Sequence, residues 1–337
     1  MAKFKNLWLN LWRGFSSAIK PIEGCNANPI LYAGSKGHFM KFGLYSGIGA
    51  AVGVFFALFY MSAKGIVIPN QLWMTFIFGA CLMWACARLF YLISLGKAFF
   101  SQPVKYLCDT GLFGQGGTVG AISFFMYLAY HLNIPLDISL DAVAYGAAIA
   151  LAIGRIGCYN YGCCWGAETH ADFGVTYTHP QAKVLRAKPE LKGLKLYPVQ
   201  LMTTLIDLCI FLILTILLLL NVYNGVVGIL YVFLQQGGRL WIEGYRDDEV
   251  VQGKHNWVIT AFGLFILALP LLLLLIFWEE GYPYLSPSIP PVAPHIVADF
   301  FNTLLSPAIW ACVIIFGTAV AFLYGWHGKQ IGSWTAK

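Results

Sequence analysis

The sequence predicts an all-α, polytopic integral membrane protein with about seven to eight transmembrane helices. Of its 337 residues, 59% are hydrophobic and only 11% are charged, and the mean hydropathy is +0.69. Soluble domains are typically about 45–50% apolar and about 25% charged, so this composition excludes a soluble fold. The apolar runs, such as LIDLCIFLILTILLLLNVY, are continuous over about 20 residues, whereas strands of a membrane β-barrel alternate polar and apolar positions.

The chain opens with a basic amphipathic segment. Within residues 1–20, an apolar face at helical spacing lies beside three cations; the face comprises Phe4, Leu7, Trp8, Leu11, Trp12 and Phe15, and the cations are Lys3, Lys5 and Arg13. Such a helix lies in the membrane interface or packs on the rim of the protein itself, and both interpretations stay open.

Eight apolar spans follow, each near the length of about 20 residues that a bilayer requires. They cover residues 42–62, 72–95, 112–132, 139–157, 198–221, 225–243, 257–278 and 306–325. The span at 139–157 is rich in Ala and Gly and carries Asp141, and such small residues favour close helix packing in lipid.

A proline-rich segment at 281–299 sets the last span apart, which suggests three parts. Residues 1–37 form an N-terminal interfacial segment, and residues 38–278 form the main membrane domain. Residues 279–337 then comprise the proline-rich loop and an extra C-terminal transmembrane helix that looks like an appendage.

Basic residues gather on one side of the predicted membrane. The polar loop at 166–197 contains five of them, Lys183, Arg186, Lys188, Lys192 and Lys195. The N-terminus and the loops near residues 100 and 250 share its side, which the positive-inside rule would place in the cytoplasm. The net charge of +6 therefore reflects basic loops and not a nucleic-acid partner.

Ionisable groups lie where lipid penalises them. Asp141, Arg155, Arg239 and Glu243 fall within or at the ends of apolar spans. A charge at mid-bilayer costs at least about 2.5–3.5 kcal/mol, so such residues usually face a partner or a cavity. Spacings of four and three place Arg239, Glu243 and Arg246 on one predicted helix face.

These arginines have two interpretations. One is a salt-bridge cluster that holds helices together. The other is an anion site, since guanidinium groups bind phosphate in a bidentate manner. Arg155 lies between Gly154 and Gly157 at the end of a helix rich in small residues, where a glycine-rich turn would let a ligand approach the backbone. The anion available in a membrane is a phospholipid head group.

The run GRIGCYNYGCCWG at 154–166 resembles the signature G-R-I-G-N-F-x-N-G-E-x-x-G of the prolipoprotein diacylglyceryl transferase family. Asp141 stands fourteen residues before Arg155, as the acid of that family does, and Gly116 and Gly117 match its H-G-G segment. YPVQL at 197–201 resembles H-P-S-Q-L, and RLWIEGYRDD at 239–248 resembles R-x-x-x-E-x-x-R-x-P-D. The resemblance covers roughly residues 38–278.

The resemblance implies an enzyme of a bacterial inner membrane that needs no cofactor. The family transfers the diacylglyceryl group of phosphatidylglycerol to a cysteine of a lipoprotein precursor, at a site open to the outer leaflet. The implied catalytic residues are Arg155, Arg239 and Gln115. The implied substrate-binding residues are Asp141, Gly116, Gly117, Gly157, Cys158, Asn160, Cys163, Gly166, Glu243 and Arg246. An outer-leaflet site conflicts with the positive-inside prediction, so orientation stays open.

The sequence also departs from the family pattern. Gln115 replaces a histidine and cannot accept a proton as that residue does. Phe42 replaces a tyrosine, Cys158 an asparagine and Cys163 a glutamate. These departures leave two alternatives: a related transferase with a different acceptor, or a non-catalytic protein that binds or transports phospholipid. No inverted repeat is visible in the sequence, which counts against a transporter.

Cys158, Cys163 and Cys164 have three possible roles. They are small packing residues, or a reactive or redox-active group beside Arg155, or zinc ligands together with His170 or His179. The spacing C-x4-C-C is not a usual zinc pattern, and packing is the interpretation that the sequence favours.

Overall fold

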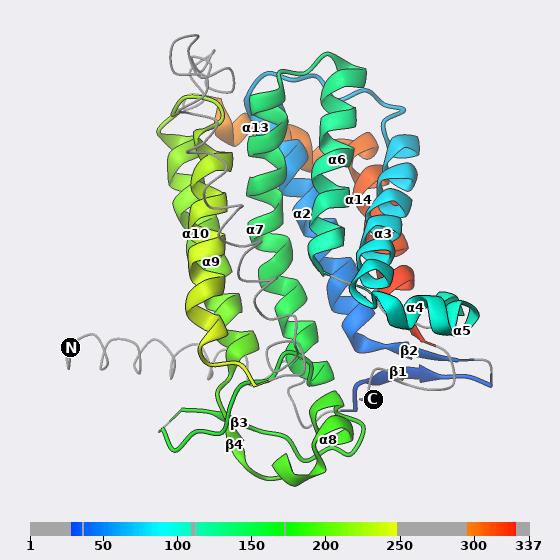
Figure 1. The fold of residues 1–337 in the computed structure, drawn as a ribbon. Helices are drawn as coiled ribbons and strands as arrows, with labels where there is room; N and C mark the ends of the chain where they lie inside the picture. Colours follow the sequence, from blue (N-terminus) through cyan, green and yellow to red (C-terminus); the bar gives the residue numbers. More distant parts are fainter. Residues whose placement is uncertain are drawn as a thin grey trace.

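The computed structural model describes residues 28–35, 37–108, 112, 114–171, 173–247 and 295–327. Its long helices run side by side as an upright bundle (Figure 1). They are α2 (Lys41–Ala63), α3 (Trp73–Ser94), α6 (Gly114–Leu132), α7 (Leu136–Tyr161), α9 (Val199–Leu219), α10 (Val226–Glu243) and α14 (Pro307–Gly325).

Five of these helices, α2, α3, α7, α9 and α14, are long and apolar enough to cross a membrane. Helices α6 and α10 accompany them in the bundle at 19 and 18 residues. The prediction of an all-α, multi-pass membrane protein is confirmed. The predicted span at 257–278 and the amphipathic segment at 1–20 lie outside the described residues.

Glycines set the close approach of α2 to α7. A Cβ atom at Gly49 would lie 2.6 Å from the carbonyl oxygen of Ala150, and one at Gly53 would lie 2.8 Å from that of Gly146. In lipid there is no hydrophobic driving force between helices, so van der Waals contact between closely packed small residues stabilises their association. The Ala/Gly-rich run in α7 therefore forms a central helix of the bundle.

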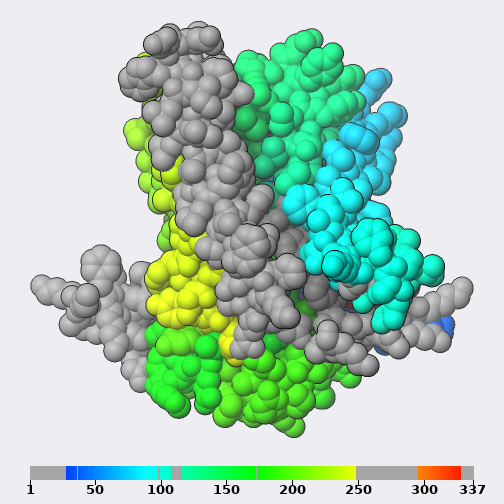
Figure 2. Space-filling model, viewed as in Figure 1, coloured from blue at the N-terminus to red at the C-terminus, as the bar shows by residue number. Residues whose placement is uncertain are grey.

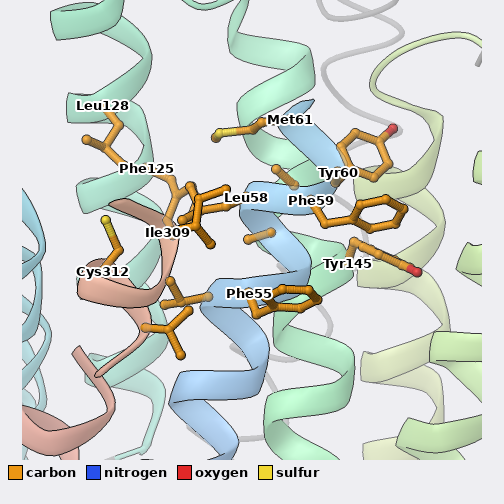
Figure 3. Packing of buried hydrophobic residues seen from close by; sticks show 14 of the residues in the cluster. Phe55, Leu58, Phe59, Tyr60, Met61, Phe125, Leu128, Tyr145, Ile309 and Cys312 are labelled. Atoms are coloured by element: carbon orange, nitrogen blue, oxygen red, sulfur yellow. The ribbon is translucent and has the colours of Figure 1, made fainter. Parts of the chain in front are cut away.

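Helix α14 packs against α2 in the same way. Gly43 faces Gly325, and Gly47 faces Gly317 and Ala321. Figure 3 shows Ile309 of α14 near Leu58 of α2, and Ile309 and Cys312 both belong to the buried core cluster that includes α2. This C-terminal helix is thus built into the main core.

Aromatic rings fill the middle of the bundle. Phe56 of α2 packs edge-to-face with Tyr145 of α7 and Phe211 of α9, with ring centroids 5.9 and 5.0 Å apart. Tyr145 stacks on Phe211 at 4.9 Å. Such ring pairs add about 0.5–1.5 kcal/mol each beyond the area that they bury.

Short elements cover the ends of the bundle. Strands β1 (Ile30–Ala33), β2 (His38–Met40) and β5 (Trp326–His327) form an antiparallel sheet in the order β1-β2-β5, with Phe39 opposite both Tyr32 and Trp326. Strands β3 (Val175–Thr176) and β4 (Lys195–Leu196) pair as a ribbon. The short helices are α4 (Lys97–Ser101), α5 (Pro103–Cys108), α8 (Lys183–Ala187), η1 (Pro189–Leu191) and α13 (Ile296–Leu305).

The connection between α7 and α9 folds into a cap with its own core. Trp165, Tyr177, Leu196 and Leu201 are almost fully buried in it. In Figure 2 this green segment forms the lower end of the molecule, below the yellow end of α10. The cap holds the loop that follows α7 in place. This loop contains residues 162–166, the last part of the run GRIGCYNYGCCWG.

Candidate functional site

Three arginines meet at a small cavity between α7, α9 and α10, close to the cap. We call this cavity, of about 30 Å³, the arginine pocket. Its charged lining residues are Arg155, Asp207, Arg239 and Arg246. Its other lining residues are Cys164, Val199, Gln200, Thr203, Ile206, Gln235, Gly238 and Ile242.

Arg155 enters the pocket from α7. The prediction of a glycine-rich turn around Arg155 was wrong. Residues 154–157 continue the helix, which ends only at Tyr161. The chain turns at Gly162, whose φ of 75° is the left-handed conformation that glycine adopts at helix ends. The guanidinium group of the half-buried Arg155 makes no hydrogen bond or ion pair with any other described residue.

Arg239 enters from α10, and Arg246 comes from beyond that helix. The prediction that Arg239, Glu243 and Arg246 share a helix face was wrong for Arg246, because α10 ends at Glu243 and the chain turns at Gly244. Backbone pairing brings Arg246 to the pocket instead. It forms an antiparallel bridge with Gly166, flanked by a 2.9 Å hydrogen bond from the Ala167 nitrogen to the Tyr245 oxygen.

Glu243 follows the pocket residue Ile242 on α10 but does not line the arginine pocket itself. Its Oε1 atom is buried and has no hydrogen-bond partner among the described residues. No ion pair joins it to Arg239 in the part of the chain that the structure describes. The salt-bridge interpretation of this cluster therefore finds no such bond here.

Asp207 is a pocket residue that the sequence analysis missed. Its side chain is fully buried on α9, next to Gln235 and facing Arg155. A lone carboxylate in the apolar run LIDLC carries the same signal that drew attention to Asp141. On the same helix, Gln200 donates a 2.7 Å hydrogen bond to the carbonyl oxygen of Cys163 and thereby ties α9 to the signature loop.

Asp141 lies elsewhere. It accepts hydrogen bonds from the Tyr60 hydroxyl at 2.9 Å and from the backbone nitrogens of Gly225 and Gly228 at 2.7 Å each. A carboxylate at this position satisfies the free N–H groups at the start of α10 and complements the helix dipole. Arg239 follows Gly228 by eleven residues, about 16 Å along the helix at the usual rise. The role of Asp141 in substrate binding stays a prediction.

The glycine-rich segment around residue 115 packs between helices. A Cβ atom at Gly116 would meet Ala87 and Phe90 of α3, and Gly117 faces the hydroxyl of Tyr324 on α14. The side chain of Gln115 lies outside the described part of the structure. The positions of Gly116 and Gly117 therefore match tight helix packing.

Two further predicted residues belong to α7 itself. Gly157 packs on α2, where a Cβ atom would approach Tyr45 to 2.9 Å. Asn160 is fully buried in the last turn of the helix. Gly166 has no room for a side chain, since a Cβ atom there would strike Tyr197 and Val199. Gly157 and Gly166 thus mark close approaches of the backbone, and none of the three residues lines the arginine pocket.

Cys158, Cys163 and Cys164 form a compact group that we call the cysteine cluster. Their sulfur atoms all lie within 4.8 Å of one another. Cys164 also lines the arginine pocket. Hydrogen bonds from the thiols of Cys158 and Cys163, with Arg246 and Arg155 nearby, hold the pKa of Cys164 well below its ordinary value.

The family model for prolipoprotein diacylglyceryl transferase matches residues 29–277 of the chain. The chain belongs to the prolipoprotein diacylglyceryl transferase family. The match contains the arginine pocket and the cysteine cluster, and it stops short of α14. The resemblance predicted from the sequence is confirmed.

Individual relatives agree with this assignment. The chain is 27% identical over 184 residues to a protein of Clostridioides difficile (strain 630), covering 53% of this chain and 68% of that one. A Dehalococcoides mccartyi protein is 28% identical over 187 residues, with coverage of 55% and 69%. One from Clostridium tetani is 32% identical over 165 residues, with coverage of 48% and 62%. Each is named phosphatidylglycerol–prolipoprotein diacylglyceryl transferase.

Proposed function

We propose that this protein transfers the diacylglyceryl group of phosphatidylglycerol to the cysteine thiol of a lipoprotein precursor, in a bacterial inner membrane. The observation that carries the proposal is the convergence of Arg155, Arg239 and Arg246 on one pocket inside the family domain. The names of its relatives supply the two substrates. Family membership supports the location, as do five helices of the described chain that are long and apolar enough to cross a membrane.

The arginines suit the charge changes of this reaction. A sulfur–carbon bond forms at the glycerol carbon of the lipid as the carbon–oxygen bond to the phosphate breaks, and glycerol phosphate leaves with the bonding electrons. Negative charge therefore builds on the phosphate in the transition state. The guanidinium groups of Arg155 and Arg239 make no hydrogen bonds or ion pairs with other described residues, and they are donors held ready for that charge.

The thiol must also lose a proton, and Gln115 cannot take it. Asp207 is the carboxylate that the described pocket presents, and it lies next to Arg155. We assign the proton to this carboxylate as general base, a role that typically contributes about 10²–10⁴-fold in rate. The acceptor would then attack as a thiolate, which is the nucleophilic form of cysteine.

The pocket must open before a lipid enters. Its volume of about 30 Å³ holds little more than a water molecule, whereas a phosphate with its glycerol is several times larger. Helix α10 forms one wall of the pocket and has few fully buried side chains. We infer that α10 moves outward from α7 and α9 to admit the head group.

A different acceptor is the second candidate function. Two positions where the family signature has Asn and Glu are Cys158 and Cys163, directly beside Arg155. These changes alter the surroundings in which an acceptor thiol would lie. The protein would still transfer a group from the donor phospholipid, but the acceptor would not be a lipoprotein cysteine.

Complementation tests the proposal. Cells that lack their own transferase should regain lipoprotein maturation when they produce this chain, and mass spectrometry should find a diacylglyceryl thioether on the precursor cysteine. Glycerol phosphate release from phosphatidylglycerol without a modified lipoprotein would favour the second candidate. If a correctly inserted protein forms neither product, that result would contradict both candidate functions.

A further inference from the structure

Three thiols from two segments converge at the end of α7. Cys158 lies in the last turn of the helix, and Cys163 and Cys164 follow the turn at Gly162. Their sulfur atoms lie within 4.8 Å of one another, although four residues separate the first cysteine from the second. The transferase chemistry proposed above uses none of the three.

The backbone is shaped to bring them together. Cys164 has a φ of 54°, a left-handed conformation in which a non-glycine residue costs roughly 1 kcal/mol or more. The Gly162 and Cys163 nitrogens both donate to the Cys158 carbonyl, at 2.9 and 3.3 Å, and close the turn. Gln200 holds the loop from the other side through the Cys163 carbonyl. The cap thus holds the strained turn in place.

The spacing of the sulfur atoms fits a metal ion. Thiolates bound at about 2.3 Å to one ion lie about 3.8–4.0 Å apart in tetrahedral or trigonal geometry. The cluster needs a contraction of less than about 1 Å to reach that spacing, whereas a disulfide would require a sulfur–sulfur distance of about 2.05 Å. Three thiolates without nitrogen or carboxylate ligands select a soft ion.

The surroundings supply charge balance and access. Arg155 and Arg246 lie near Cys164 and would offset the negative charge of thiolates bound to an ion. Cys158 is buried, but Cys163 and Cys164 are partly exposed, and Cys164 opens onto the arginine pocket. A small ion therefore has a route to the sulfur atoms from the pocket side. Among the described residues, no His, Asp or Glu side chain joins the three.

We propose that Cys158, Cys163 and Cys164 form a binding site for one thiophilic metal ion, Zn²⁺ or Cu⁺. On binding, three metal–sulfur bonds form and the three thiol protons pass to solvent, with no change in oxidation state. Where the ion keeps a fourth position, that position is filled by water. Cys164 borders the arginine pocket, but the test of the metal site does not depend on transfer activity.

The test measures metal bound to the full-length protein. The chain is purified in detergent under reducing conditions, incubated with Zn²⁺ or Cu⁺ alone, desalted and analysed for bound metal by mass spectrometry. We expect one equivalent of one of these ions on the wild type. Cys158→Ser, Cys163→Ser and Cys164→Ser should each weaken binding by more than about tenfold, since loss even of a supporting residue around a metal costs about 10–100-fold. The matched controls Cys81→Ser and Cys209→Ser, outside the cluster, should bind as the wild type does.

A second measurement needs no variant and so is independent of whether the serine variants fold. Alkylation of the wild type, mapped by peptide mass, should show that the bound ion protects Cys158, Cys163 and Cys164 but not the exposed Cys81. Three results would overturn the proposal: no retained metal, equal alkylation with and without metal, or a disulfide within the cluster in protein isolated from cells.

Discussion

Two buried carboxylates show how the surroundings of a residue decide its part. Asp141 and Asp207 are both fully buried in membrane helices. Asp141 accepts three hydrogen bonds, from Tyr60 and from the start of α10, and is fully occupied by structure. Asp207 lines a pocket beside an arginine. We therefore propose a structural part for Asp141 and a chemical part for Asp207.

Replacement of Asp141 tests the structural side. Asp141→Ala leaves the buried N–H groups of Gly225 and Gly228 without their acceptor, and each such group costs about 1–3 kcal/mol. We expect a loss of at least about 2 kcal/mol, seen as a lower midpoint of thermal unfolding in detergent. Tyr60→Phe, which removes one donor, should cost about 1 kcal/mol. Equal stability of wild type and Asp141→Ala would show that the carboxylate is not a helix cap.

Replacement of Asp207 tests the chemical side. Asp207→Asn keeps the size of the side chain but removes its capacity to take a proton. We expect the transfer rate to fall about 10²-fold or more while phosphatidylglycerol still binds. Single-turnover transfer and equilibrium lipid binding, measured on the same preparation, separate the two effects. An unchanged rate would remove Asp207 from the mechanism.

At the scale of elements, α14 extends the family domain. The match to the family ends at residue 277, yet α14 packs into the core through glycine contacts with α2. Strand β5 continues from α14 and pairs with β2, so the C-terminal helix is attached to the bundle at two places. The sequence suggested an appendage because the proline-rich segment precedes the helix, and a linker of that kind says nothing about where the next helix docks.

The contact between α14 and α2 has a direct test. A Cβ atom at Gly47 would lie 2.6 Å from the Gly317 carbonyl oxygen, so Gly47→Leu forces the two helices apart. We expect destabilisation of about 1–3 kcal/mol or more from this overpacking. The control is Gly237→Ala on α10, where no neighbouring atom lies within 4 Å and where Ala favours the helix. Thermal unfolding should separate the two variants, and equal midpoints would contradict the close packing.

His327 makes the β5 end of the molecule sensitive to pH. Burial, together with the facing Arg186 and His38, lowers the pKa of His327 below its ordinary value of 6.5, and Tyr161 packs on its ring. The unfolded chain then binds a proton below about pH 6.5 that the folded chain does not. Stability from this group is complete above that pH and declines as the pH falls toward the lowered pKa. Unfolding midpoints between pH 8 and pH 5 should decline less steeply for His327→Gln, and equal slopes would count against this origin.

At the scale of the whole molecule, the sequence predicted the helices better than the site. Hydropathy located the spans because lipid requires about 20 apolar residues per crossing. The convergence of Arg155 and Arg239 followed from two charges that each needed a cavity. Arg246, by contrast, reaches the pocket through backbone pairing with Gly166, which no helical spacing encodes.

Other features depend on long-range folding. The cysteine cluster arises from a left-handed residue at Cys164, and the cap that supports it is assembled from short strands with weak patterns. The five basic residues of the 166–197 loop lie in this cap, and Figure 1 shows the cap elements β3, β4 and α8 at the lower end of the bundle. An anionic lipid surface would therefore meet positive charge at the end where the pocket lies.

We propose that Arg155 and Arg239 act together on the phosphate of the donor lipid. The direct measurement is the rate of diacylglyceryl transfer from phosphatidylglycerol to a precursor peptide, followed by mass spectrometry of the peptide. We predict that Arg155→Ala and Arg239→Ala each lower the rate by at least about 10²-fold in protein that still folds, as loss of a preorganised donor does. Arg88→Ala, an arginine on α3 that binds the backbone of α5, should keep the wild-type rate. Transfer at the wild-type rate by both pocket variants would contradict the account.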